Sequence, residues 1–109
     1  MGRGDRLPGT LELLILKTLE RGPNHGFGIT LHVQTVSDGM LRMEEGSLYP
    51  ALHRLEKRGW LKAEWRDSET GREAKFYALT RLGRKQLDAE AANWDRLAGA
   101  VALIMRTVE

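Results

Sequence analysis

The residues best suited to binding chemistry lie on one predicted helix, residues 47–58. Its apolar side chains fall within a narrow sector at 100° per residue: Leu48, Ala51, Leu52 and Leu55. The opposite side carries Tyr49, Pro50, His53, Arg54 and Lys57. Phenol, imidazole, guanidinium and ammonium groups donate hydrogen bonds to phosphate oxygens and to acceptors on base edges. The pattern predicts a face that binds nucleic acid, and a solvated basic helix face is the alternative.

The positive charge of the chain is concentrated around this helix. The 109 residues carry 17 Lys and Arg against 15 Asp and Glu, a net charge of only +2. Residues 46–66 hold five basic and two acidic side chains, whereas residues 22–45 hold one basic and three acidic. The small total therefore hides a basic segment of the kind that binds phosphates.

Other kinds of site are excluded because their groups are missing or scattered. The sequence has no cysteine, so it can form no disulfide, thiolate metal site or cysteine nucleophile. His25, His32 and His53 fall on different predicted elements and supply no pair of metal ligands on one face. Glu44 and Glu45 are adjacent carboxylates whose charge favours the N-terminus of the next helix. With no phosphate-binding loop or nucleophile motif either, the sequence predicts a non-enzyme without metal or cofactor.

Short periodic segments separated by Pro and Gly must position the basic face. Predicted helices run from Thr10 to residues 22–23, from residues 24–26 to residues 38–39, and from Ser47 to Arg58, with Gly59 closing the third. Pro50 is expected within the first turn of the third helix, where its missing N–H costs little. Beyond Gly59 the period changes, because residues 60–66 and 74–78 alternate in polarity around turn residues 67–72. This alternation predicts a two-stranded hairpin.

A basic helix followed directly by a hairpin is the layout of a winged helix-turn-helix, in which the hairpin forms the wing. The hairpin carries Arg66, Arg72 and Lys75, and Thr80 then caps a final helix of about 25 residues. The predicted fold class is therefore mainly α with a small β-hairpin. We assign residues 1–80 to a winged helix-turn-helix DNA-binding domain and residues 81–109 to a C-terminal dimerisation helix.

The final helix carries an unbroken apolar seam with spacings of four and three residues, which Leu97 and Ile104 widen on one side and Leu103 on another. Nine of these side chains form the predicted dimer interface: Leu87, Ala91, Trp94, Leu97, Ala98, Val101, Ile104, Met105 and Val108. A chain of 109 residues offers too little surface to cover this stripe, which favours a homodimer. An intramolecular core helix is the alternative.

Four separated motifs resemble the PadR family of bacterial transcriptional regulators. Residues 46–61 are similar to the family's signature segment, and residues 11–16 to its first helix. Residues 25–29 resemble the start of its second helix, with Phe27 where tyrosine is usual, and residues 76–84 the close of its wing. The resemblance covers about residues 7–88. It implies a dimeric DNA-binding repressor, often one whose DNA affinity is lowered by a small ligand.

The resemblance also assigns roles to individual positions. It implies that Ser47, Tyr49 and Arg54 face DNA, that Arg72 and Lys75 contact phosphates from the wing, and that His25 and Gly26 approach the DNA backbone. Lys57 supplies a further phosphate contact, whereas Lys62 and Arg66 are weaker candidates. For Tyr49 the alternative is a half-buried ring packed against the second helix.

A ligand site is a further implication of the resemblance. In the short form of the family, with a single C-terminal helix, a tryptophan in a similar place lines a cavity where flat aromatic ligands stack. Trp94 occupies that place between Ala91 and Ala98, and an ordinary core tryptophan is the alternative. The expected partners are double-stranded DNA, a second copy of the chain and a small aromatic effector.

The location and a second function complete the predictions. The N-terminal residues hold no signal-peptide core, and the longest apolar stretch, residues 97–105, is too short to cross a bilayer, so we expect a cytoplasmic protein. The alternative function is a winged-helix interaction module whose basic face meets an acidic protein. Steep, sequence-dependent and salt-dependent binding to a duplex distinguishes the regulator from this module.

Overall fold

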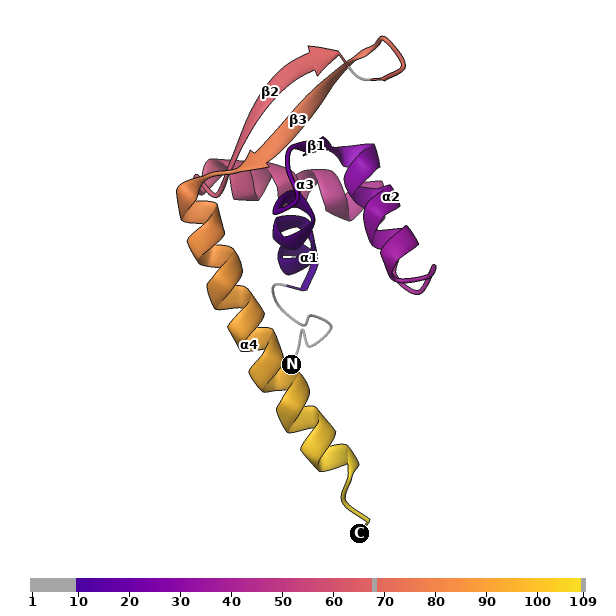
Figure 1. The fold of residues 1–109 in the computed structure, drawn as a ribbon, viewed down its shortest axis with the longest axis vertical. Helices are drawn as coiled ribbons and strands as arrows, with labels where there is room; N and C mark the ends of the chain where they lie inside the picture. Colours follow the sequence, from indigo (N-terminus) through magenta and orange to yellow (C-terminus); the bar gives the residue numbers. More distant parts are fainter. Residues whose placement is uncertain (1–9, 68, 109) are drawn as a thin grey trace.

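The computed structural model describes residues 10–67 and 69–108. Residues 1–9, which were assigned to the DNA-binding domain, Ser68 of the predicted turn, and Glu109 lie outside the described residues. The elements, in chain order, are α1 (Thr10–Leu19), β1 (Asn24–His25), α2 (Gly26–Val36), α3 (Glu45–Lys57), β2 (Leu61–Asp67), β3 (Glu73–Leu79) and α4 (Arg81–Met105). Figure 1 shows α1, α2 and α3 gathered on one side of the sheet, with α4 extending away from them. The predicted fold class, mainly α with a small β-hairpin, is confirmed.

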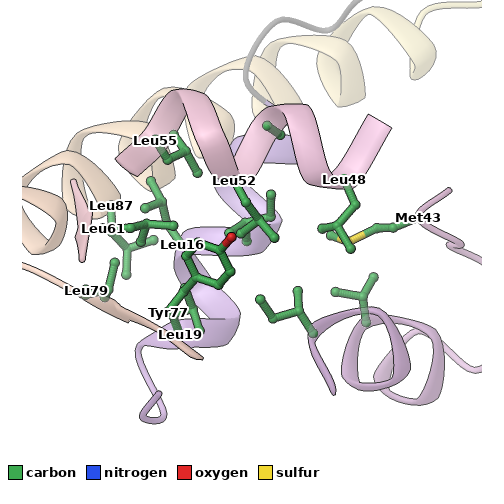
Figure 2. Close-up of a cluster of buried hydrophobic side chains, with 14 residues drawn as sticks. Leu16, Leu19, Met43, Leu48, Leu52, Leu55, Leu61, Tyr77, Leu79 and Leu87 are labelled. Atoms are coloured by element: carbon green, nitrogen blue, oxygen red, sulfur yellow. The ribbon is translucent and has the colours of Figure 1, made fainter. Parts of the chain in front are cut away.

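The core lies where α1, α2 and α3 meet the sheet. Its largest fully buried side chains come from all three helices: Ile15, Leu16, Leu19, Ile29, Leu48, Leu52 and Leu55. Figure 2 shows Leu52 of α3 above Leu16 and Leu19 of α1, beside Tyr77 of β3. Each fully buried Leu stabilises the fold by roughly 1.5–3 kcal/mol relative to an exposed one. The predicted apolar sector of the third helix is therefore confirmed, and its burial leaves the basic side of α3 facing outward.

The sheet has one strand more than the predicted hairpin. β2 and β3 pair antiparallel with Leu61 opposite Leu79 and Asp67 opposite Glu73, as the alternation predicts. The additional strand, β1, pairs with the other edge of β3, so the strand order is β1-β3-β2. β1 contains only Asn24 and His25, which is too short a segment to show a strand period.

The start of α3 also differs from the prediction. The helix begins at Glu45, two residues before the expected Ser47, and the N–H groups of Ser47 and Leu48 both donate to the Glu44 carbonyl. Pro50 is therefore in the second turn and not the first. At this position a helical residue donates to the carbonyl of Gly46, and Pro50 cannot do so because it has no N–H. The acidic pair next to the helix start favours the earlier beginning, because Glu45 lies within the first turn, near the positive end of the helix dipole.

α4 joins the rest of the fold through its first turns alone. Thr80 caps the helix as predicted: its hydroxyl accepts from the Gly83 N–H at 3.0 Å and donates to the Gly59 carbonyl at 2.6 Å. Gly83 and Leu87 are buried, whereas every residue from Ala92 to Met105 is exposed. The described chain accordingly measures 58 × 29 × 26 Å, with α4 forming the long projection in Figure 1. None of the helices in residues 10–67 and 69–108 is long and apolar enough to span a membrane.

Candidate nucleic-acid interface

α3 presents its polar side chains to solvent. Ser47, Tyr49, His53, Arg54 and Lys57 are all exposed, while the opposite side of the helix is buried. The structure thus brings four of the predicted DNA contacts together on one helix surface, and His53 lies among them. A helix of this diameter fits the major groove of B-form DNA, where such donors meet base edges and phosphates.

The N-terminus of α2 lies directly beside this surface. A β-carbon placed on Gly26 would lie 2.6 Å from the hydroxyl oxygen of Tyr49, so only glycine permits the observed approach of the two helices. The Tyr49 ring packs against α2 and is still 46% exposed. Its hydroxyl therefore lies where the N-terminus of α2 meets the exposed face of α3.

His25 caps α2 and has a defined hydrogen-bonding arrangement. Its Nδ1 accepts from the Gly28 N–H at 3.0 Å, so the neutral ring carries its hydrogen on Nε2. The ring meets Phe76 edge-on, with 5.1 Å between centroids, and the Arg66 guanidinium lies 4.2 Å above the same Phe76 ring. The Nε2 donor and the first N–H groups of α2 are together suited to a phosphate oxygen.

The wing, strands β2 and β3 with the turn between them, carries basic residues both next to its turn and close to α3. Arg72 is exposed beside the turn, whereas Lys75 lies near α3, where its ammonium is 3.3 Å from the Glu56 carboxylate and 5.5 Å from the centre of the Tyr77 ring. Partial desolvation acts to lower the pKa of Lys75, but the Glu56 carboxylate and Tyr77 raise it above its ordinary value. Lys75 is therefore a cation at neutral pH and can take a DNA phosphate as a partner.

Arg54 of α3 and Arg58, which caps the C-terminus of α3, turn toward α1 and share the carboxylate of Glu12. The Arg54 Nε lies 3.5 Å from Glu12 Oε2, and Arg58 Nη1 donates to both carboxylate oxygens at 3.2 and 3.4 Å. Our sequence reasoning missed this contact. One feature of the sequence does indicate such a contact. Glu12 lies three residues before Ile15 and seven before Leu19, so it falls on the buried face of α1, where an apolar residue is expected.

The predicted dimer interface is mostly uncovered in the single chain. Trp94 and Val101 are 40% and 48% exposed, and Leu97, Ile104, Met105 and Val108 are exposed as well. Leu87 is different, because it is 4% exposed and belongs to the chain's own core. The structure thus places the first residue of the seam inside the protomer and leaves the later ones without cover.

Comparison with known proteins identifies the family. A family model described as the transcriptional regulator PadR-like family matches residues 15–89. The chain belongs to this family. The match agrees with the resemblance found over residues 7–88 and covers α2, α3 and the whole sheet, which carry the candidate interface.

Solved structures of transcriptional regulators share the fold. A PadR family transcriptional regulator of Eggerthella lenta is 31% identical, with a TM-score of 0.74 over 92% of this chain and 85% of that one. A transcriptional regulator of Clostridium thermocellum is 26% identical, with a TM-score of 0.81 over 90% of this chain and 95% of that one. An uncharacterized protein of Lysinibacillus sphaericus is 27% identical over 109 residues, the full length of both chains.

Membership in the PadR-like family decides the general function. The protein is a DNA-binding transcriptional regulator with a winged helix-turn-helix, and it is not an enzyme, as the sequence predicts. The individual contacts predicted for His25, Gly26, Ser47, Tyr49, Arg54, Lys57, Arg72 and Lys75 stay predictions. The structure gathers these residues on α3, on the start of α2 and on the wing.

Proposed function

We propose that this PadR-like regulator is a homodimeric repressor that binds a pseudo-palindromic operator. The observation that carries the proposal is the apolar face of α4, which residues 10–67 and 69–108 of the chain leave exposed from Trp94 to Val108. Two such faces cover each other when two chains pair, and obligate dimer interfaces have this apolar character. Two α3 helices related by a two-fold axis then enter successive major grooves about 34 Å apart.

The proposal divides the chain as the sequence suggests, with residues 1–80 binding DNA and residues 81–109 forming the dimer. Ser47, Tyr49 and Arg54 contact base edges or the nearby backbone from α3. Lys57, Arg72 and Lys75, with His25 and the N-terminus of α2, hold phosphates on either side. In this proposal the protein acts in the cytoplasm, together with the DNA that it binds.

Selection from a library of random duplexes tests the operator directly. We expect the purified protein to enrich a pseudo-palindrome and to bind it with two chains per duplex and a steep dependence on salt. A reporter gene placed behind the enriched sequence should then be repressed when the protein is expressed. Enrichment of no sequence, with weak binding that salt does not change, would favour the interaction module instead.

Substitutions of Arg54 and Lys75 should separate base readout from phosphate contact. Arg54→Ala is expected to weaken binding to the enriched duplex by about ten- to a hundredfold and binding to random DNA much less. Lys75→Ala should weaken both similarly and reduce the slope of log affinity against log salt by about one. Fluorescence anisotropy titrations at several salt concentrations measure both effects. Equal losses on the two duplexes for both variants would contradict base readout by Arg54.

The α4 interface also suggests an effector site around Trp94. Its neighbours one turn away on the same face are Ala91 and Ala98, whose small side chains leave space beside the indole. A flat aromatic compound bound there, between two α4 helices, would change the separation of the two α3 helices. A change of a few ångströms would then keep both from fitting successive grooves at once.

Fluorescence titration with a panel of aromatic compounds tests this site. We expect saturable quenching in the wild type and in Trp65→Phe, a control that removes the exposed wing indole, and its loss in Trp94→Phe. The compound that binds should lower operator affinity by about five- to a hundredfold, the usual range of coupling between two sites. If no compound in the panel quenches saturably, Trp94 is an ordinary interface residue.

A further inference from the structure

Glu12 is an acidic residue in an apolar position. It shares the buried face of α1 with Ile15 and Leu19, and its side chain is 16% exposed. A carboxylate removed from water in this way loses hydration and requires partners of opposite charge. Glu12 is therefore suited to its position on α1 by its ion pairs with Arg54 and Arg58, and not by apolar packing.

The partners of Glu12 are unequal. Arg58 donates to both carboxylate oxygens through Nη1, and its guanidinium also lies 5.0 Å over the Trp60 ring. Arg58 is thus held by two contacts to the carboxylate and by the Trp60 ring, although its side chain is 46% exposed. Arg54 meets Glu12 through Nε alone, at 3.5 Å, and its side chain is half exposed. Within the part of the chain that the structure describes, the Nη1 and Nη2 groups of Arg54 make no hydrogen bond.

We infer that Glu12 is a positioning residue for base readout by Arg54, an inference that rests on the proposed operator binding. The carboxylate meets the guanidinium at Nε, and we assign the contact with a DNA base to Nη1 and Nη2. Two parallel N–H donors match the O6 and N7 acceptors of a guanine in the major groove. Because the side chain is held before DNA arrives, less conformational entropy is lost on binding.

The same contact has an opposite interpretation that makes the inference falsifiable. If Glu12 merely competed with DNA for the arginine, removing its charge would release Arg54 and strengthen binding to the operator. If Glu12 positions Arg54, removing its charge weakens the operator complex relative to random DNA. The two interpretations therefore predict changes of opposite sign in the ratio of specific to non-specific affinity.

The test uses Glu12→Gln, which keeps the shape of the side chain, with Glu20→Gln as the matched control. Glu20 follows α1 and pairs with the exposed Lys17 at 2.6 Å, and its substitution likewise removes one negative charge. We expect both to raise affinity for random DNA slightly, through charge alone. Only Glu12→Gln should lower the specificity ratio, by about three- to tenfold, the effect of freeing one flexible side chain. An unchanged or increased ratio relative to Glu20→Gln would overturn the inference.

A double-mutant cycle separates positioning from a general structural role. In the Arg54→Met background, Glu12→Gln should change the specificity ratio no further, because the side chain it positions is gone. An equal loss in both backgrounds would show that Glu12 acts through the fold. If Glu12→Gln fails to fold, Glu12→Asp keeps the charge but draws it back by one methylene, and it should lower the ratio in the same way. Failure of the wild type to select any duplex would reject operator binding itself, a result distinct from all of these.

Discussion

Replacing Val101 by aspartate is expected to make the protein monomeric at micromolar concentration and to weaken operator binding at least about a hundredfold, because the two DNA-binding domains are no longer linked. Val101 lies on the seam of α4 and is 48% exposed in the single chain. In the proposed dimer its neighbours are the apolar side chains of the partner's α4. A carboxylate there would be buried without a counter-charge, which costs several kcal/mol.

Leu103 provides the matched control for this prediction. It lies on the same helix, two residues further on, on the side opposite the seam, and it is 63% exposed. Leu103→Asp adds the same charge and should leave both the dimer and the DNA affinity nearly unchanged. Sedimentation equilibrium and operator titration on the two variants measure the effect. A dimeric Val101→Asp protein, or equal loss in both variants, would exclude the proposed seam.

The features that the sequence predicts well depend on local patterns. The apolar sector of α3 consists of four residues spaced at the helical period, and all four are buried. The Thr80 cap and the 25-residue length of α4 follow in the same way from a polar residue before a long periodic run. Each of these signals lies within a few residues of the structure that it specifies.

The features that the sequence does not reveal depend on contacts between distant segments. β1 forms because Asn24 and His25, which follow α1, pair with the free edge of β3, more than 50 positions later in the chain. The contact between Glu12 and Arg58 joins residues 46 positions apart. Neither has a local pattern, and in a single sequence nothing states which segments will meet. Charge at an apolar position of a helix is nevertheless a visible sign that a partner is needed.

The α4 seam shows how a local pattern can span two different environments. Its spacing is continuous from Leu87 to Val108, yet Leu87 packs into the protomer's own core while Trp94 and later residues stay exposed. The period of a helix identifies the buried face but not the chain that buries it. The change of environment falls one to two turns after Leu87, where α4 leaves the other helices behind (Figure 1).

Replacing Gly83 by alanine is expected to lower the free energy of unfolding by up to about 2 kcal/mol, since overpacking a tight contact costs about 1–3 kcal/mol and the gain in helix propensity offsets about 1 kcal/mol of this cost. A β-carbon on Gly83 would lie 3.0 Å from the carbonyl carbon of Trp60 and closer still to its oxygen. The obstacle is backbone, held in place because the same carbonyl accepts from the Thr80 N–H at 3.1 Å. The first turn of α4 must therefore move.

Gly99→Ala is the control, because it makes the same change on the same helix where a β-carbon would have no neighbour within 4 Å in the described chain. It should stabilise the protein by up to about 1 kcal/mol through helix propensity. Urea unfolding at equal protein concentrations compares the two, since the stability of a dimer depends on concentration. A stabilising Gly83→Ala would contradict the close packing of α4 on Trp60. In the proposed dimer, movement at Gly83 also tilts a helix about 37 Å long and so changes the spacing of the two α3 helices. The variant should therefore weaken operator binding even where it stays folded and dimeric.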